Sequence, residues 1–252
     1  MTLTFGSLFS GIGGLDLGLE RAGLRCVWQV EIDEFCRAVL ARHWPAVRRH
    51  DDVRTFPPTD PSEWGCDVIA GGFPCQDASK ANPAGAGASG SRTGLWREYV
   101  RVVGVLRPRL VLMENVPALL ARGFGDVLGA LAGLGYDAEW GVLPASTLGA
   151  PHHRERLFLA AYPGRPGVAG LVAVPHPRPA GPWGWRGEAD LLAVAGAPFE
   201  PGDRWPQPML RSVADGVPAG RVAHVTAAGN AVVPAVAEFL GRRAVALLTE
   251  EP

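Results

Sequence analysis

The 252-residue sequence has few cysteines, and their spacing excludes the common zinc-binding patterns. The four are Cys26, Cys36, Cys66 and Cys75, and no two of them form a C-x-x-C pair. The adjacent histidines at 152–153 have no cysteine near them, so no cluster shows the ligand spacing of a zinc site. We therefore expect no metal centre, and thiols that stay reduced as in a cytoplasmic protein.

Long apolar runs and an excess of positive charge are also missing. Because no stretch reaches about 18 apolar residues, we expect no membrane-spanning helix. The N-terminus does not show the charged and then apolar pattern of a signal peptide. The formal net charge is -1, so any binding of nucleic acid has to use a local basic patch. The 47% hydrophobic content is enough for one large domain, with or without a small lobe.

A glycine-rich turn follows the first predicted strand, over residues 3–9. The turn reads Phe9-Ser10-Gly11-Ile12-Gly13-Gly14. A helical pattern of leucines begins after it and stops at Gly23. A strand, a glycine turn and a helix make up the nucleotide-binding arrangement of a doubly wound sheet. Since Asp16 stands where G-x-G-x-x-G has its third glycine, the pattern disfavours an oxidoreductase that uses a nicotinamide.

Two further predicted strands end in acidic residues. Glu31 stands at the tip of a strand over 26–30, roughly 20 residues beyond the glycines, where a carboxylate can bond to ribose hydroxyls. The alternative is a surface glutamate that caps the next helix. Asp52 ends a strand over 47–52, near the expected position of an adenine ring, and an ordinary turn aspartate is the alternative there.

One cysteine stands between a buried strand and a small-residue loop. The strand covers 66–70, the loop covers 80–91, and Gly71-Gly72-Phe73-Pro74-Cys75-Gln76-Asp77 joins them. The strand would fix Cys75 while the loop closes over a substrate, and both features favour a nucleophile. Taken by itself, a free cysteine such as Cys75 is more often a small buried hydrophobic residue than a nucleophile.

The next strand, over 109–113, ends in Glu114-Asn115-Val116-Pro117. In a parallel sheet Glu114 would share a crevice with Cys75, and desolvation would raise its pKa, as acid catalysis requires. Arg154 and Arg156 are two residues apart, so a strand places both on one face, where they suit a phosphate or a base carbonyl oxygen. The alternative for Glu114 is the start of a helix with no catalytic role. The alternative for the two arginines is a salt-bridged surface.

In this order, these pieces resemble the motifs of the DNA (cytosine-5)-methyltransferases. The resemblance implies an α/β fold: a Rossmann-like, doubly wound, mostly parallel sheet of the class I methyltransferase type, with a small recognition lobe. It implies S-adenosylmethionine as the cofactor, held by Phe9, Ser10, Gly11, Gly13, Gly14, Glu31, Ile32, Asp52, Val53, Phe73, Pro74, Asn230, Ala231 and Val232. One departure from the family pattern is His152, which stands in place of glutamine.

The resemblance also implies the chemistry. The thiolate of Cys75 adds to C6 of a flipped-out cytosine, Glu114 holds or protonates N3, and C5 takes the methyl group. Arg154 or Arg156 fixes O2, and either one lowers the pKa of the thiol. The residues expected to contact the substrate are Gln76, Ser79, Asn115 and Val116.

Three segments follow from the resemblance: a catalytic domain over 1–161, a target-recognition lobe over 162–222, and a last motif with its helix over 223–252. The lobe is short and irregular, with ten prolines and eight glycines in 162–208. The implied partner is double-stranded DNA, with a cognate restriction enzyme as a possible companion. We expect a monomer in the cytoplasm, encoded by a bacterium or phage. The alternatives are the same chemistry on tRNA and a non-catalytic DNA-binding relative. The recognition sequence stays open.

Overall fold

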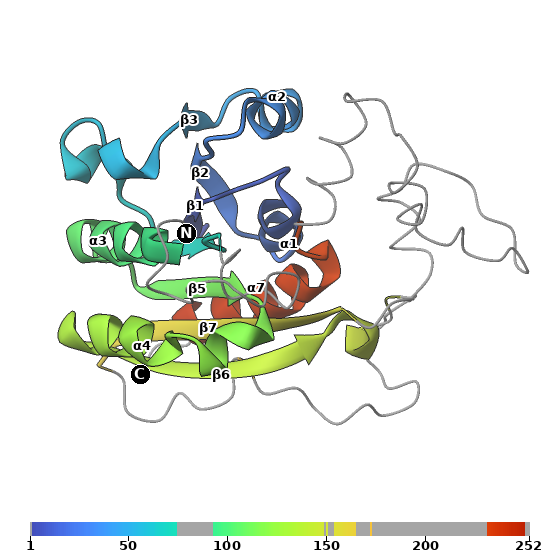
Figure 1. Ribbon diagram of the computed structural model, residues 1–252. Coiled ribbons are helices and arrows are strands. Elements are labelled where there is room, and N and C mark those ends of the chain that lie inside the picture. Colours follow the sequence, from blue (N-terminus) through green and yellow to red (C-terminus); the bar gives the residue numbers. More distant parts are fainter. Residues whose placement is uncertain are drawn as a thin grey trace, which may run out of the picture.

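A seven-stranded mixed sheet forms the centre of the protein (Figure 1). The computed structural model describes residues 2–74, 93–148, 150, 154–164, 172 and 231–249. In sequence order, the strands are β1 Thr4–Leu8, β2 Arg25–Val30, β3 Arg48–His50, β4 Val68–Gly71, β5 Leu110–Asn115, β6 Tyr136–Pro144 and β7 Glu155–Pro163. Their order across the sheet is β3-β2-β1-β4-β5-β7-β6.

The first five strands run parallel, and β7 enters antiparallel between β5 and β6. Every residue of β4 and of β5 is buried. Such continuous burial is what a central parallel strand covered on both faces requires, and it explains the unbroken apolar sequence there. The predicted α/β class and the mostly parallel sheet are confirmed.

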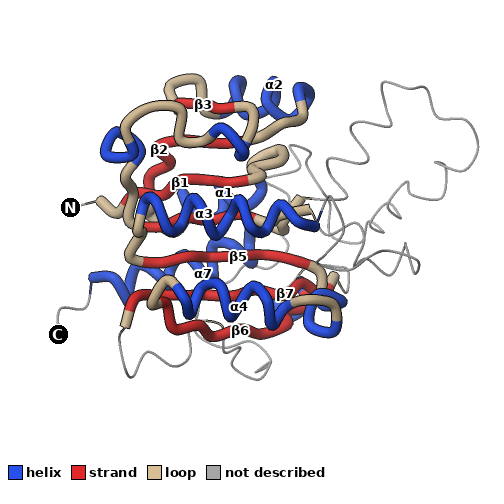
Figure 2. Tube along the Cα trace, turned by 60° about the vertical axis from the view of Figure 1, so that its left-hand side comes forward, coloured by secondary structure: helices blue, strands red, loops and turns tan. Residues whose placement is uncertain are grey.

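Helices cover both faces of the sheet (Figure 2). The described helices are α1 Gly14–Arg21, α2 Glu34–His43, α3 Trp96–Leu106, α4 Phe124–Gly133 and α7 Pro234–Thr249. α1 and α7 pack into one apolar core, and α3 and α4 pack into the other, on the opposite face. No helix in these described stretches is long and apolar enough to cross a membrane.

Glycines bring α1 and α7 close together. A Cβ at Gly18 would collide with the carbonyl of Pro234 and with Ala237, and one at Gly241 would press on Ala22. The two helices can therefore approach at backbone distance only because these positions carry no side chain. The C-terminal helix is thus packed against the helix that follows the glycine-rich turn.

The parallel pairing aligns the carboxyl ends of three strands. Leu8 of β1 pairs with Gly71 of β4, which pairs with Met113 of β5. The connections that leave these strands therefore start at one edge of the sheet, where doubly wound folds bind their ligands. Several predicted site residues lie outside the described residues: Cys75, Gln76, Ser79, His152, Asn230 and almost all of the lobe over 162–222.

Candidate active site

Glu114 is a buried carboxyl at the end of β5, with 9% of its surface exposed. Burial raises its pKa from 4.5 to about 7, although the charges of Arg156 and Arg154 act in the opposite direction. An ion pair of 3.0 Å joins the Glu114 carboxylate to Nε of Arg156. The predicted rise in pKa is confirmed. A carboxyl that titrates near neutral pH can donate or accept a proton there.

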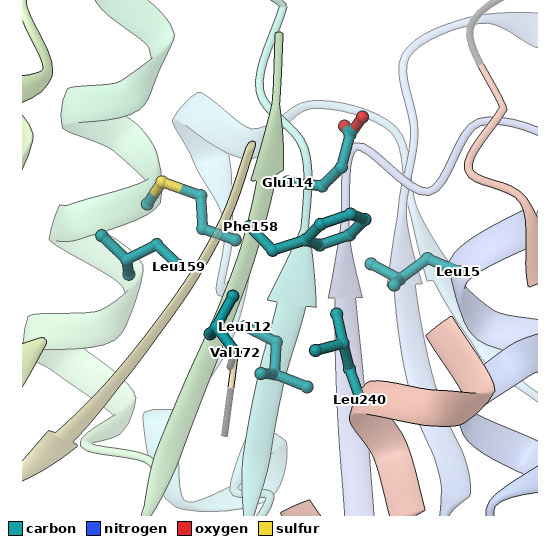
Figure 3. A pocket seen from close by; sticks show the side chains of 8 residues that line it. Leu15, Leu112, Glu114, Phe158, Leu159, Val172 and Leu240 are labelled. Carbon is teal, nitrogen blue, oxygen red and sulfur yellow. The ribbon is translucent and has the colours of Figure 1, made fainter. Parts of the chain in front are cut away.

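Apolar side chains packed beside Glu114 contribute to the burial that raises its pKa. A small cavity beside it is lined by side chains such as Leu15, Leu112, Phe158 and Leu240. Figure 3 shows the carboxylate of Glu114 pointing away from these apolar side chains. The carboxylate therefore lies at the boundary between the core and the edge of the sheet, where it loses water without losing its arginine partner.

The chain leaving β4 passes directly over Glu114. A Cβ at Gly72 would lie 2.5 Å from a Glu114 carboxylate oxygen, and one at Gly71 would collide with the carbonyl of Leu8. These contacts explain the glycine pair, because a side chain at Gly72 would push the chain away from β5 and one at Gly71 would push it away from β1. The segment that leads to Cys75 is therefore held against the carboxyl.

Asn115 holds that segment from the other side. Its side-chain amide donates to the Phe73 carbonyl at 3.1 Å, and its carbonyl oxygen accepts from the Val116 amide at 2.9 Å. Asn115 and Phe73 are both buried. Both ends of the Asn115 amide are thus bonded to backbone, which fixes the start of the Cys75 loop two residues before the cysteine.

The two arginines have different partners. Arg156 pairs with Glu114, whereas Nη2 of Arg154 donates to the Ala231 carbonyl at 3.0 Å. Burial and the nearby charge of Arg156 lower the pKa of Arg154. The sequence placed both guanidiniums on one face, and the structure directs one to the end of β5 and the other to the segment before α7.

The glycine-rich turn has the backbone shape that its sequence predicts. Phe9, Gly11 and Gly13 all have positive φ angles, of 54°, 55° and 84°. The Ser10 amide donates to the Val30 carbonyl at 3.1 Å, which ties the turn to the end of β2. No side chain in the described part caps the start of α1, so amide groups at that end are available to a ligand.

Glu31 fixes this turn from the tip of β2. Its carboxylate accepts from the Gly11 amide at 2.7 Å and from the Asp33 amide at 2.8 Å. The side chain that caps α2 belongs to Asp33, which accepts from the Cys36 amide. Arg37, which sequence reasoning missed, donates to the carbonyls of Glu31 and Ile32. The predicted neighbours Gly11 and Glu31 are thus brought together.

Asp52 is bonded within its own turn. Its two carboxylate oxygens accept from the guanidinium of Arg54 at 2.9 and 2.7 Å, and this partner lowers its pKa. It also accepts from the Arg54 amide, as a turn aspartate does. The neighbouring Val53 is buried, whereas Ile32 is 64% exposed. A role of Asp52 beside an adenine ring stays a prediction.

A buried polar cluster under the glycine-rich turn was missed by sequence reasoning. Asp16 has no exposed surface, and it accepts from the Ser7 hydroxyl at 3.0 Å and from the Gln29 amide at 2.9 Å. Burial raises its pKa to about 6. The signal in the sequence was an acidic residue inside a run of leucines, which we took only as a break in a glycine pattern.

Among the described residues, no group of three potential ligands could hold a metal ion. The site is therefore made of one buried carboxyl with its arginine, a glycine turn with its glutamate, and the chain that leads to Cys75. A mostly parallel sheet with these groups at its carboxyl edge defines an α/β protein of the methyltransferase class.

The chain belongs to the C-5 cytosine-specific DNA methylase family, whose model matches residues 3–172. It is 37% identical to the type II methyltransferase M2.BsuMI of Bacillus subtilis over 166 residues, which are 62% of this chain and 41% of that protein. It is 32% identical to M.NgoFVII of Neisseria gonorrhoeae over 61% of this chain and 42% of that protein. The chain thus spans less than half the length of these relatives.

A solved structure of similar shape is the Entamoeba histolytica methyltransferase EhMeth, with a TM-score of 0.67 and 14% identity. The comparison covers 99% of this chain and all of that chain. This likeness supports the class I methyltransferase fold. The family match ends at residue 172, so the last motif and most of the predicted lobe lie beyond it.

Proposed function

We propose that this chain transfers a methyl group from S-adenosylmethionine to C5 of cytosine in double-stranded DNA. The observation that supports the proposal most is the Glu114 and Arg156 pair at the end of β5, with the Cys75 segment held over it by Gly72 and Asn115. The family match and the type II methyltransferase relatives support the reaction class.

The cofactor would bind where the glycine-rich turn meets Glu31. The positive φ angles at Phe9, Gly11 and Gly13 let the backbone approach a ligand, and the uncapped start of α1 offers amide groups. Exposed Ile32 offers an apolar surface to a ring. These residues fit a nucleoside with a ribose and a flat base. When bound, S-adenosylmethionine supplies an electrophilic methyl group on sulfur.

The chemical problem is that C5 of cytosine is a weak nucleophile. The thiolate of Cys75 forms a bond to C6, and Glu114 gives a proton to N3, which makes C5 electron-rich. C5 then takes the methyl group. A base such as solvent water takes the C5 proton, the electrons of that bond form the C5–C6 double bond and expel the Cys75 thiolate, and N3 returns its proton to Glu114. The Cys75 thiolate and the proton of Glu114 are thus both restored.

Glu114 and Arg156 suit this sequence of steps. A pKa of about 7 means that Glu114 is partly protonated at neutral pH and can give and recover a proton without a large penalty. Arg156 limits that rise, and its guanidinium can also donate to O2 of the base. Its positive charge would favour the thiolate form of Cys75.

The substrate and setting are part of the same proposal. A cytosine in a duplex has to be flipped out, at a cost of a few kcal/mol, before a thiolate can reach C6. Gln76, Ser79 and Val116 would then contact the base or its neighbours. We further propose a monomer in the cytoplasm, in a restriction–modification setting, since its relatives are named type II methyltransferases.

A covalent complex tests this function directly. Duplex DNA that contains 5-fluorocytosine should trap the protein, because fluorine at C5 cannot leave as a proton and the Cys75 bond cannot break. We expect a DNA-dependent shift in denaturing gels that needs S-adenosylmethionine and disappears in Cys75→Ser. An equal shift in Cys75→Ser would exclude Cys75 as the nucleophile. A shift that appears with tRNA containing 5-fluorocytosine, and not with the duplex DNA, would indicate RNA as the substrate.

A further inference from the structure

The segment before α7 contacts both Arg154 and the start of α1. Ala231 accepts the hydrogen bond from Arg154, which immediately precedes β7 and lies 77 residues earlier in the chain. The next residue, Val232, places its carbonyl so close to Gly14 that a Cβ there would collide with it. Gly14 is the first residue of α1, at the end of the glycine-rich turn.

Arg154 is itself firmly placed. Its backbone carbonyl accepts from the Ala145 amide at 3.0 Å, which fixes it beside the end of β6. Its Nε is buried and has no hydrogen-bond partner among the described residues. A half-buried guanidinium next to Arg156 needs an acceptor to offset desolvation and repulsion. The Ala231 carbonyl is the acceptor that the described residues provide.

We propose that Arg154 is a positioning residue for the cofactor half of the site, which holds residues 231–233 against the start of α1. Arg156 serves the base half through Glu114. Arg154, just before β7, and Arg156, on β7, would thus hold the two halves in register, and Arg154 would act without touching the base. This inference rests on the proposed use of a nucleoside cofactor.

The proposal predicts which part of the protein weakens when the Arg154 guanidinium is removed. Without the Arg154 guanidinium, residues 231–233 lose a charge-assisted bond and can move away from Gly14. The first turn of α7, where the Val236 amide donates to the Val233 carbonyl, would then open more often. Cofactor affinity would fall because the turn that holds it loses its support.

Arg109 offers a matched control. Its Nη2 donates to the Leu248 carbonyl at 2.8 Å. Arg109 therefore also bonds to a backbone carbonyl, but at the opposite end of α7 from Ala231. Arg109→Ala removes this bond and the 3.5 Å ion pair of Arg109 with Asp67, and it leaves the segment beside Gly14 untouched. It should lower stability without changing cofactor affinity.

The test measures binding of S-adenosylmethionine and S-adenosylhomocysteine by calorimetry, without DNA. We expect Arg154→Ala to weaken binding about tenfold, as loss of a hydrogen bond from a charged group does. Arg109→Ala and Arg156→Ala should stay within about twofold of the wild type, since neither contact supports the turn. Arg154→Lys should recover part of the loss. Unchanged affinity in Arg154→Ala, or an equal loss in Arg109→Ala, would overturn the proposal.

Hydrogen exchange separates this inference from the proposed function. In Arg154→Ala, the amides of Val236 and Ala237 should exchange faster, whereas Arg109→Ala should affect only the far end of α7. If the wild-type protein binds neither S-adenosylmethionine nor S-adenosylhomocysteine, the proposed function fails. The hydrogen exchange of the Val236 and Ala237 amides then still decides the role of Arg154. Unchanged exchange at Val236 would exclude the contact as a support of residues 231–233.

Discussion

The two halves of the site are held together in different ways. The cofactor half, formed by the glycine-rich turn and Glu31, is joined by bonds between residues about 20 apart in the sequence, from the Ser10 amide to the Val30 carbonyl and from the Gly11 amide to the Glu31 carboxylate. The base half joins the ends of β4, β5 and β7 through side chains that lie up to 42 residues apart, as in the bond between Asn115 and Phe73. Local sequence specifies the first half, and packing of the whole sheet specifies the second.

This comparison predicts that changes in each half should affect different kinetic constants. In the proposed mechanism, the charged groups of the base half interact with the reacting atoms, so variants in this half should lower kcat. The cofactor half shapes a backbone turn, so its variants should weaken cofactor binding and leave kcat at saturation nearly unchanged.

The largest effect should come from Glu114→Gln. An amide cannot give N3 a proton, so kcat should fall by at least about a hundredfold. In the wild type, activity should decline as pH rises above about 7, because the carboxyl with the raised pKa loses its proton there. That decline should be absent from the residual activity of the variant. A pH–rate profile of the wild type without a decline near 7 would contradict the acid role.

A smaller effect is expected from Gly72→Ala. The added methyl group would lie 2.5 Å from the Glu114 carboxylate and would push the Cys75 segment away. We expect kcat to fall about tenfold, with the cofactor dissociation constant unchanged, as for a catalytic group moved from its position. Gly125→Ala is a control, because a Cβ there meets nothing within 4 Å. An equal loss of activity in that control would remove the steric explanation.

The cofactor half should respond through affinity. In Glu31→Gln, one carboxylate oxygen becomes an amide nitrogen, which cannot accept a hydrogen bond, so the bond from either the Gly11 amide or the Asp33 amide is lost. Cofactor binding should weaken about tenfold, while kcat at saturation stays within about twofold. Glu34→Gln, at an exposed position nearby, is the matched control. A loss confined to kcat would place Glu31 in the base half.

Asp16→Asn should affect activity least and stability most. The folded-state pKa of Asp16 is raised from 3.8 to about 6, so its favourable contribution is complete below the unfolded value and is lost as pH rises through 6. The stability of the wild type relative to Asp16→Asn should therefore fall by about 1 kcal/mol between pH 5 and pH 8. Urea unfolding of both proteins at the two pH values measures this difference. A difference that stays constant would exclude a raised pKa.

Sequence reasoning performed better on the local half. A glycine turn after a strand, followed by an acid at the next strand tip, predicted that Gly11 and Glu31 belong to one site, and the structure joins them by a hydrogen bond that the sequence did not predict. The strand ends at Glu114 and Gly71 were also predicted, because buried parallel strands are continuously apolar.

The sequence could not assign partners to the arginines. Arg154 and Arg156 have the same spacing in any strand, and their separate partners, Ala231 and Glu114, come from distant segments. The Asp16 cluster was missed for a similar reason, since its partners are on β1 and β2 and no local pattern announces a buried acid. The pairing of Asp52 with Arg54 is local in the sequence. It was missed because the position of Asp52 at a strand end predicts only a ligand contact and says nothing about a neighbouring side chain that binds the same carboxylate.

The most direct test of the proposed function is the transfer of labelled methyl groups from S-adenosylmethionine to duplex DNA of mixed sequence, followed by mapping of the products. We predict label at C5 of cytosine, with none in Cys75→Ser and far less in Glu114→Gln. Label on tRNA and not on duplex DNA would contradict the substrate. No label on either nucleic acid, from a protein that still binds the cofactor, would contradict catalysis itself.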